Sequence, residues 1–413
     1  MSKSYFSLGL MSGTSGDGVD ASIIQSDGDT KHKVVLDKYF EYSQNIYNNI
    51  HALKDKINDS KDLNKLAKEI KLLEKEITLF HTNAVNEIIK EIKSNIDFVG
   101  FHGQTIFHNA KEKISKQLGD GKLLSKLTKK TVICDFRQND LLNGGHGAPL
   151  TPIFHKLLKK KFKIKELRFV NIGGIVNMTR LWKDDNMSGT DIGPGMCLID
   201  RWVRQKLKKN YDENGIIAKS GKVNKISLDQ LLKNFYEKKI ILGKGSIQTY
   251  DTKNFDKSGI IAKSGKINKI ALNQLLENFY EKENILGTGS IKSFDTKYFD
   301  FSFVKDLSLE DGAATLTEFT ARIIISALKA TNYNKKKIIL CGGGRKNNFL
   351  VKKLKEENNV IKLIDEYGVD GDFIESQAFA YLAIRSYINL PISFPETTGA
   401  GKPCTGGVII KNF

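Results

Sequence analysis

The 413-residue chain contains little cysteine and has no long apolar run. Its four cysteines lie far apart and form no C-x-x-C pair, which excludes a zinc ribbon and a disulfide framework and fits a reducing cytoplasm. A run of about 18 apolar residues, the least that spans a membrane, is absent. The N-terminus soon reaches polar residues and glycine, so we expect no signal peptide. These absences predict a cytoplasmic protein with no membrane partner.

Two common nucleotide-binding motifs are also missing. No G-x-x-x-x-G-K-[ST] segment occurs, which excludes a P-loop. Segment 13–18 has the glycine spacing G-x-x-G-x-G, which reverses the order of the dinucleotide-binding motif, and it leads into a predicted strand rather than a helix. Any nucleotide site in this chain therefore uses a different kind of glycine turn.

Positive charge is in excess, because 65 lysines and arginines outnumber 47 aspartates and glutamates and leave a net charge of +18. Such an excess can indicate nucleic-acid binding. Here the lysines are spread along the chain, and the runs at 159–161 and 335–337 contain no interleaved aromatic residue. We therefore expect no nucleic-acid partner, whereas an anionic small molecule such as a nucleotide suits the same charge.

An internal repeat accounts for part of the length. Residues 215–258 recur as residues 259–302, and 32 of the 44 aligned positions are identical. Two copies are too few to form a solenoid, so the repeat indicates a tandem duplication within a fold that is otherwise complete. Each copy contains a predicted helix, at 228–236 and at 272–280. Without one copy, 369 of the 413 residues remain to be explained.

Apolar periodicity predicts an α/β protein. Strands are predicted at 4–10, 19–25 and 338–341, and a strand–turn–strand unit at 168–181. Apolar residues three and four apart predict an amphipathic helix or helix pair between Leu63 and Ile92, and a further helix passes through Leu198, Trp202 and Leu207. Strands separated by helices, with glycine turns at the strand ends, are typical of α/β folds.

Three glycine turns are candidate phosphate sites, at 13–18, at 190–195 and at 342–344. Backbone amides of such turns can surround phosphate oxygens because glycine allows close approach. Asp17 in the first turn can hold Mg²⁺, and Asp191 gives the second turn a similar carboxylate. The need for a tight hairpin would explain each turn alone. Three together, two of them with an aspartate, predict a nucleotide site.

Polar residues near the predicted strand 98–101 form a second candidate region. His102 and Gln104 are two residues apart and are predicted to share one face of the strand. A metal pair with His108, polar contacts to a sugar, and a structural histidine all remain open at this stage.

Arg137 follows in the segment DFRQND. A guanidinium group at this position can bind a substrate carboxylate in a bidentate way. The alternative is a surface ion pair with Asp135 or Asp140.

Together with the motifs around them, these residues resemble the anhydro-N-acetylmuramic acid kinases of the sugar kinase/heat-shock protein/actin superfamily. The resemblance covers nearly the whole chain and is carried by nine motifs in order: GLMSGTSGDGVD (9–20), FHGQTIFH (101–108), DFRQND (135–140), GGHGAPLTP (144–152), VNIGGIVNMT (170–179), GTDIGPG (189–195), LCGGGRKN (340–347), IESQAFAYLAIR (374–385) and FPETTGA (394–400). The implied fold is a pair of actin-like (RNase H-like) lobes, residues 1–165 and 166–413, with ATP in the cleft between them. The C-terminal tail is free to pack back on the first lobe.

The resemblance also implies a reaction. Such enzymes convert 1,6-anhydro-N-acetylmuramic acid, ATP and water to N-acetylmuramic acid 6-phosphate and ADP, with Mg²⁺, in the cytoplasmic recycling of cell-wall sugar. Asp191 matches the catalytic base. The implied ATP-binding residues are Gly13, Thr14, Ser15, Gly16, Asp17, Gly18, Val19, Asp20, Gly193, Gly195, Gly342, Gly343 and Gly344. The implied sugar-binding residues are His102, Gln104, Arg137, Asp140 and Glu375. A kinase for a related sugar, a non-catalytic nucleotide-binding remnant, and a homodimer remain open.

Three features depart from the family pattern. Gly16 stands where a leucine is common, and Met196 replaces an asparagine that usually follows the D-x-G-P-G segment. The third departure is the duplication, which falls in the second lobe. The family's Lys-Ser pair is present in the second copy as Lys292-Ser293, whereas the first copy has Gln248-Thr249. We therefore expect the second copy to supply this segment, and the surplus 44 residues to bulge from the lobe.

Overall fold

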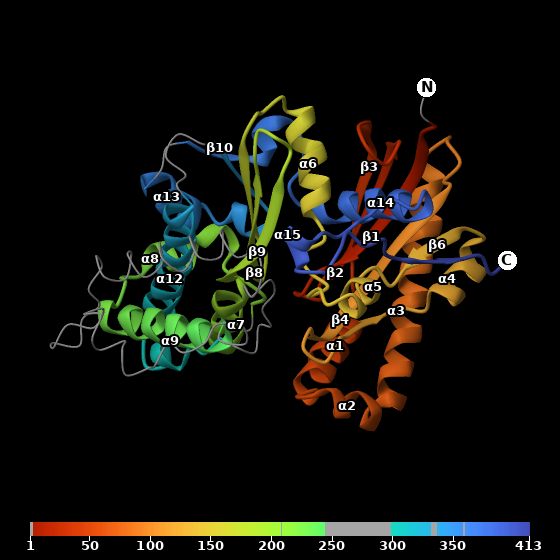
Figure 1. Cartoon of the computed structure of the whole chain (residues 1–413). Coiled ribbons are helices and arrows are strands. Elements are labelled where there is room, and N and C mark those ends of the chain that lie inside the picture. Colours follow the sequence, from red (N-terminus) through yellow and green to blue (C-terminus); the bar gives the residue numbers. More distant parts are fainter. Residues whose placement is uncertain (1–2, 208, 244–298, 332–336, 358–359) are drawn as a thin grey trace. The chain divides into compact units, whose positions relative to one another are not determined.

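The computed structural model describes residues 3–207, 209–243, 299–331, 337–357 and 360–413. The chain forms two compact units (Figure 1). Unit 1 contains Met1–Lys165, Leu181–Gly189 and Gly368–Phe413, and unit 2 contains Glu166–Arg180 and Thr190–Tyr367. A single boundary at residue 165 therefore does not describe the division, because two later segments belong to unit 1. In the described residues, each unit has one β-sheet with helices, so the predicted α/β class is confirmed.

Unit 1 is built on a seven-stranded mixed sheet with the order β12-β6-β4-β1-β2-β3, and β5 pairs with β4. β1 is antiparallel to β2 and parallel to β4. The first two strands confirm the predicted strand pair. The strands are β1 (Tyr5–Ser12), β2 (Gly18–Ser26), β3 (His32–Glu41), β4 (Phe98–Asn109), β5 (Ile114–Leu118), β6 (Thr131–Cys134) and β12 (Val408–Ile410).

Helices of unit 1 come from both ends of the chain. They are α1 (Gln44–Lys56), α2 (Ser60–Lys65), α3 (Ala67–Ile88), α4 (Gly121–Thr128), α5 (Gln138–Leu142), α6 (Pro152–Lys161), α14 (Ile374–Tyr387) and α15 (Pro395–Thr398). The prediction of an amphipathic helix or helix pair between Leu63 and Ile92 is confirmed by α3, whereas α2 buries none of its residues. Ile70, Leu73, Ile77 and Ile88 of α3 are buried because their spacing places them on one face of the helix. No helix within the described ranges is long and apolar enough to cross a membrane.

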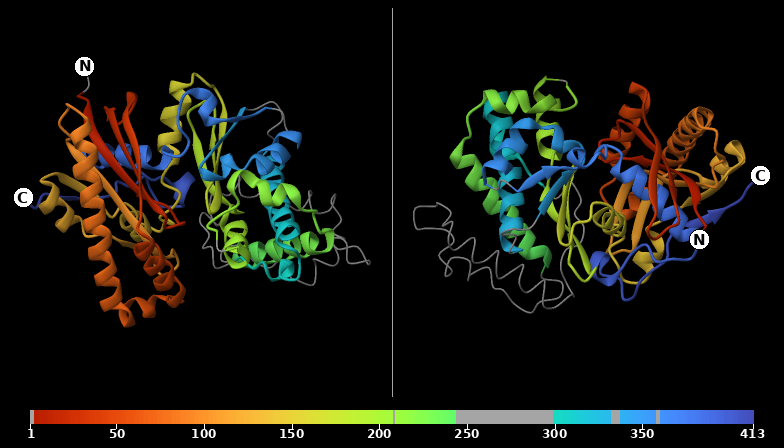
Figure 2. Two further views of the ribbon diagram at one scale, coloured as in Figure 1. Left: turned by 180° about the vertical axis from the view of Figure 1, so that it is seen from behind. Right: turned by 90° about the horizontal axis from the view of Figure 1, so that it is seen from above.

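The two faces of the unit 1 sheet are covered differently (Figure 2). Leu8 and Leu10 of β1 pack with Ile70 and Ile77 of α3 in one apolar cluster. Gly9 lies between these leucines and therefore faces the opposite side, where α14 crosses the sheet. Alternate residues of β1 therefore pack against different helices: the two leucines against α3 and the glycine against α14.

A row of small and polar residues lies beneath α14. Gly100, Gly9, Ser22 and Asp37 are cross-strand neighbours on β4, β1, β2 and β3. A Cβ atom on Gly9 would lie 2.0 Å from the carbonyl oxygen of Ser376, so the helix backbone rests directly on the strand. At the end of the row, the Ser22 hydroxyl lies 2.6 Å from the Ser376 hydroxyl, and Gln377 donates to the Asp37 carboxylate at 2.9 Å.

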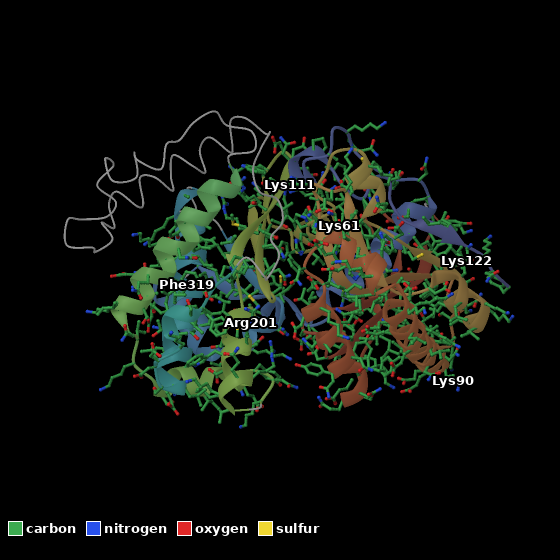
Figure 3. The ribbon with its side chains drawn as sticks, turned by 90° about the horizontal axis from the view of Figure 1, so that it is seen from below. Lys61, Lys90, Lys111, Lys122, Arg201 and Phe319 are labelled. Carbon is green, nitrogen blue, oxygen red and sulfur yellow. The ribbon has the colours of Figure 1, made fainter. Side chains whose placement is uncertain are left out.

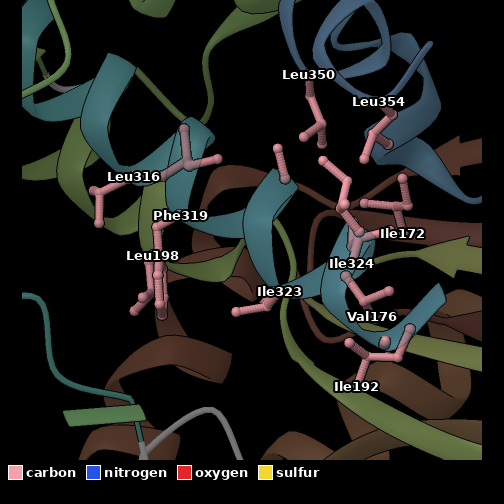
Figure 4. Packing of buried hydrophobic residues seen from close by; sticks show 14 of the residues in the cluster. Ile172, Val176, Ile192, Leu198, Leu316, Phe319, Ile323, Ile324, Leu350 and Leu354 are labelled. Atoms are coloured by element: carbon pink, nitrogen blue, oxygen red, sulfur yellow. The ribbon is translucent and has the colours of Figure 1, made fainter. Parts of the chain in front are cut away.

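Unit 2 has a five-stranded sheet of order β11-β10-β7-β8-β9 and a core around the long helix α12. Leu316, Phe319 and Ile323 of α12 lie in this core (Figure 4). The predicted strand–turn–strand unit is confirmed as β7 and β8. The elements are β7 (Leu167–Ile172), β8 (Ile175–Leu181), β9 (Met187–Pro194), β10 (Lys337–Cys341), β11 (Ile361–Leu363), α7 (Cys197–Leu207), α8 (Ile216–Ser220), α9 (Lys225–Gly243), α12 (Leu309–Ala330) and α13 (Asn348–Glu357).

The prediction of a turn at 190–195 is wrong, because residues up to Pro194 belong to strand β9. The hairpin turn before this strand lies earlier, where Trp182 donates its backbone N–H to Asn186 at 3.0 Å. Glycine at 193 has a packing role: a Cβ atom there would lie 2.7 Å from the Phe235 ring. The sequence signal for a glycine turn therefore came from a close contact in the core.

Part of the duplicated region is built into the unit 2 core. The predicted helix of the first copy is confirmed within α9, where Leu228, Leu231, Leu232 and Phe235 are buried. Phe299, near the end of the second copy, packs against Phe235 with ring centroids 6.2 Å apart. The predicted helix 272–280 and the Lys292-Ser293 pair lie outside the described residues.

Lysine side chains extend from many elements of unit 1. Lys61, Lys90, Lys111 and Lys122 are exposed, and they come from four different segments (Figure 3). This arrangement matches the even spread of lysine along the sequence.

We predict that Gly9→Ala destabilises unit 1. The added Cβ would overlap the backbone of α14, which cannot move away without separating from the sheet. Overpacking of this kind should lower the free energy of unfolding by about 2–3 kcal/mol, measured by urea denaturation. Gly401→Ala is the matched control, since a Cβ atom on Gly401 would come no closer than 3.7 Å to any non-adjacent atom. Equal stability of both variants would contradict direct backbone packing.

We also predict that stability falls steeply in mild acid. Burial lowers the pKa of His32, His81 and His108 to about 4, that of His155 to about 3, and that of His102 well below 6.5. Below pH 6.5 each ring takes up a proton on unfolding. As the pH falls, each histidine therefore lowers the free energy of unfolding by up to about 1.4 kcal/mol per pH unit, until the pH reaches its pKa in the folded state.

Asp37 acts in the opposite sense, because burial raises the pKa of its carboxyl to about 6 and the folded state then favours the protonated form. Between pH 4 and 6, its effect on the free energy of unfolding offsets that of about one of the five histidines. Urea denaturation at pH 5 and pH 7.5 should therefore show a loss of several kcal/mol at the lower pH. His155→Gln should reduce the proton uptake on unfolding by about one. A free energy of unfolding that is constant over this range would refute the prediction.

Candidate active-site residues

The glycine turn of unit 1 joins β1 to β2 at Gly13–Asp17, as predicted. Gly16 has a φ of +65°, and its N–H closes the turn on the Gly13 carbonyl at 3.2 Å. Ser15 donates its hydroxyl to the Asp17 carboxylate at 2.7 Å. Gly18 opens β2, and a Cβ atom there would lie 2.4 Å from the Phe40 carbonyl oxygen, so only glycine fits. Val19 and Asp20 continue the strand.

The carbonyl groups of this turn are bound by side chains from neighbouring elements. Gln104 of β4 donates its amide to the Gly13 oxygen at 2.9 Å. Lys54 of α1 donates to the Thr14 oxygen at 2.9 Å, and the His51 ring lies 2.8 Å from the Ser15 oxygen. Gln104, predicted for the sugar, therefore contacts the glycine turn. Sequence reasoning missed His51 and Lys54, for which the only signal is their spacing of three on one amphipathic helix.

Gln104 and His102 lie in different surroundings despite their spacing of two. Leu10 pairs with Phe101 but Ser12 pairs with Gln104, so β4 carries one extra residue at this point. Gly103 has a φ of +74°, which fits a bulge. The bulge breaks the alternation on which the predicted shared face depended.

His102 and Arg137 form the centre of a second polar group in unit 1. The His102 Nε2 atom accepts from the Arg137 guanidinium at 2.9 and 3.2 Å, and Arg137 also donates to the Gly147 carbonyl at 2.7 Å. The other ring nitrogen lies 2.7 Å from the Gly103 carbonyl oxygen, which can only accept. The proton of the neutral ring is therefore on Nδ1.

The environment of His102 keeps its ring neutral. Burial, and then the Arg137 charge, hold the pKa of His102 well below its usual value of 6.5. Its ring also packs on Phe379 of α14 with centroids 4.5 Å apart. A neutral, fixed ring with a lone pair on Nε2 orients the guanidinium group and leaves it positively charged.

Asp140 connects this group to two loops. Its carboxylate accepts from the Gly147 backbone N–H and from the Thr398 hydroxyl, each at 2.6 Å. His146 donates its backbone N–H to the Thr398 carbonyl at 2.8 Å. The segments GGHGAPLTP and FPETTGA are therefore held together by a buried carboxylate.

His108 lies 2.9 Å from the Ser115 hydroxyl through Nδ1, and burial with the nearby Arg137 charge lowers its pKa to about 4. Among the residues that the structure describes, no three His, Cys, Asp or Glu side chains gather in a metal-binding cluster. The Nε2 atom of His102 already faces the Arg137 guanidinium. These contacts favour polar and structural roles for the two histidines over a metal pair.

Unit 2 carries the remaining candidates except Glu375, which lies in the first turn of α14 in unit 1. Asp191 is buried on β9. Gly195 is packed against the Gly173 carbonyl, since a Cβ atom there would lie 2.2 Å from that oxygen. Met196, which departs from the family pattern, packs against the unit 2 core.

The third glycine turn follows β10 and leads to α13. Gly342 has a φ of +79° and lies against β7, so that a Cβ atom would be 2.3 Å from the Asn171 side chain. Gly343 and Gly344 open a short 3₁₀ turn. Arg345 donates to both oxygens of Asp365, at 2.7 and 2.9 Å, and so fixes this turn.

Two solved structures show weak similarity to the chain. An activator of 2-hydroxyisocaproyl-CoA dehydratase from Clostridium difficile has 13% identity and a TM-score of 0.38, over 93% of this chain and 96% of that one. A reductive activator for a corrinoid, iron-sulfur protein has 13% identity and a TM-score of 0.42, over 95% of this chain and 63% of that one. Similarity this weak does not indicate the family to which the chain belongs.

Sequence comparisons are decisive. The sequence model of the family "Anhydro-N-acetylmuramic acid kinase" matches residues 5–245 and 240–412. A protein of that name from Pelagibacter ubique is 48% identical over 423 aligned positions, which cover all of both chains. Another from Zymomonas mobilis is 33% identical over 97% of this chain and 98% of the relative. The chain therefore belongs to the anhydro-N-acetylmuramic acid kinase family.

Proposed function

We propose that this protein phosphorylates 1,6-anhydro-N-acetylmuramic acid with ATP in the cytoplasmic recycling of cell-wall sugar. Water attacks the anomeric carbon, the bond from that carbon to O6 breaks, and O6 attacks the γ-phosphate. The products are N-acetylmuramic acid 6-phosphate and ADP. Full-length similarity to relatives with this name carries the proposal. We also propose that the two units are actin-like lobes.

Asp191 is assigned the role of general base, which takes the proton from the attacking water. It matches the family's catalytic aspartate, and it is fixed on a strand, which limits the motion of its carboxylate. A positioned base of this kind contributes about 10²–10⁴-fold to a rate.

The sugar is assigned to the polar group of unit 1. Arg137 binds the substrate carboxylate through a charged, bidentate contact, because the neutral His102 ring fixes its orientation without competing for its charge. Asp140 holds the surrounding loops through two hydrogen bonds. Glu375 completes the set from the first turn of α14.

ATP is assigned to residues 13–20 of unit 1, which bind the phosphates, and to two groups of glycines in unit 2. These are Gly193 and Gly195, which follow Asp191 along the chain, and Gly342–Gly344, which bind the adenosine. Mg²⁺ fits the donors of the first turn, because Asp17 is exposed there and Asp20 follows closely on β2. One or two carboxylates plus phosphate oxygens are the usual ligands of this ion. When bound, it neutralises charge on the phosphates.

The proposal predicts a product and one essential carboxylate. Incubation with ATP, Mg²⁺ and the anhydro sugar should give, by mass spectrometry, a species heavier than the sugar by one phosphate group and one water. Asp191→Asn should lower kcat by about 10²–10⁴-fold, because it removes the base, and should leave the Kd for ADP nearly unchanged.

Asp184→Asn is the matched control, since Asp184 is an exposed residue in the hairpin before β9. Retained turnover in Asp191→Asn would remove Asp191 from the base role. Nucleotide binding by the natural protein without any product would instead favour a non-catalytic remnant.

We further propose that one 44-residue copy is surplus and that the second copy supplies the functional Lys-Ser pair. The two possible deletions, of 215–258 and of 259–302, give chains of equal length that differ at twelve positions. The buried leucines and phenylalanine of α9 recur in the second copy as Leu272, Leu275, Leu276 and Phe279, so either deletion keeps this part of the core. Deletion of 259–302 also places Lys257 where Phe301 packs against Trp202, and should therefore give the less stable protein.

Deletion of 215–258 keeps Lys292-Ser293 and should therefore leave the higher kcat, measured by the same product assay. Urea denaturation of both proteins serves as the control for folding. Higher activity after deletion of 259–302 would show that the assignment of the second copy is wrong.

A further inference from the structure

The first glycine turn is held by three side chains on three successive carbonyl groups. Gln104 binds the oxygen of Gly13, and Lys54 and His51 bind those of Thr14 and Ser15 at 2.8–2.9 Å. The three donors come from β4 and α1, which flank the turn in unit 1. Contacts to consecutive carbonyls fix the orientation of consecutive peptide planes.

Peptide geometry gives these contacts a consequence for the amide groups. In a trans peptide the C=O and the N–H of the next residue point in opposite directions. Carbonyls turned toward Gln104 and Lys54 therefore direct the N–H groups of Thr14 and Ser15 away from these donors. The N–H of Gly16 instead closes the turn on Gly13. Successive backbone N–H groups in a turn can bind an anion such as a phosphate group.

The donors differ in how firmly they are placed. Gln104 is fully buried, and its amide nitrogen must face Gly13 because a carbonyl oxygen can only accept. The His51 ring stacks near Tyr47, with centroids 4.4 Å apart. Lys54 is half-buried and brings a positive charge beside the turn. Gln104 and His51 are therefore held by their surroundings in β4 and α1, whereas Lys54 contacts the turn through its charged end.

We infer that His51, Lys54 and Gln104 are positioning residues for the nucleotide phosphates. They act through the backbone of Gly13–Gly16. Gln104 and Lys54 orient the N–H groups of Thr14 and Ser15 toward the bound phosphate, and His51 fixes the peptide whose Gly16 N–H closes the turn. This inference rests on the proposed function, in which the turn binds ATP. It also moves Gln104 from the sugar site, where the family resemblance placed it, to the nucleotide site.

The test separates nucleotide binding from folding and from sugar binding. Lys54→Met keeps the aliphatic stem but removes the donor, and should raise both the Kd for Mg-ADP and the KM for ATP about 5- to 10-fold. Gln104→Glu keeps the shape but removes the amide donor and adds negative charge, so the increase should exceed about tenfold. The KM for the sugar should change less than about twofold in both.

Conservative and matched variants complete the design. Lys54→Arg and His51→Gln retain a donor and should stay within about twofold of the natural protein. Lys56→Met is the matched control, because Lys56 lies on the same helix but pairs with Glu69 at 2.7 Å. Urea denaturation checks that each variant is folded.

An unchanged Kd for Mg-ADP in folded Lys54→Met and Gln104→Glu would overturn the inference. So would an equal rise in the KM for the sugar, or an equal effect of Lys56→Met, which would indicate a general loss of charge. Because the Kd is measured without sugar, it is informative even if the natural protein forms no product. Failure of the proposed function and failure of this inference are therefore distinguishable.

Discussion

Direct contact between the backbone of α14 and the strands of unit 1 is the constraint on which this unit depends. Gly9 and Gly100 have no side chain under the helix, so the helix backbone occupies the space that a Cβ atom on either residue would fill. Ser22 and Asp37 extend the same row with hydrogen bonds to Ser376 and Gln377. A helix near the C-terminus thereby covers one face of a sheet that begins with the first strand.

The geometry of the candidate sugar-binding group around His102 and Arg137 depends on this packing. Phe379 of α14 supports the His102 ring, which in turn orients Arg137. Glu375 lies one turn earlier on the same helix. The C-terminal segment also supplies Thr398, which binds Asp140. Residues from the two ends of the sequence are therefore positioned by one helix–sheet contact, and a change at Gly9 would affect them together.

Local patterns in the sequence predicted elements such as β1, β2 and α3, and the apolar spacing of α3 follows from burial on one face. They did not predict β3, α12 or α14. The glycine turns at 13–18 and 342–344 were also predictable. The segment 190–195 was not, because the need for glycine at 193 comes from the Phe235 ring, a distant residue. The surroundings of Gln104 depend on a one-residue bulge at Gly103, which no periodicity reveals.

The duplication lengthens the chain between two aromatic residues that are in contact in the unit 2 core. Phe235 and Phe299 are in contact although 64 residues separate them, and without one 44-residue copy they would be only 20 residues apart. The closure entropy of a loop grows with the logarithm of its length, so this increase costs only about 1 kcal/mol. The buried leucines and phenylalanine of α9 recur unchanged in the second copy, and the differences in this stretch fall at positions such as 229 and 233, outside that buried set. The leucine and phenylalanine core of α9 therefore does not select between the copies. They are distinguished by Phe301, which packs against Trp202 and has Lys257 as its counterpart in the first copy, and by the Lys292-Ser293 pair.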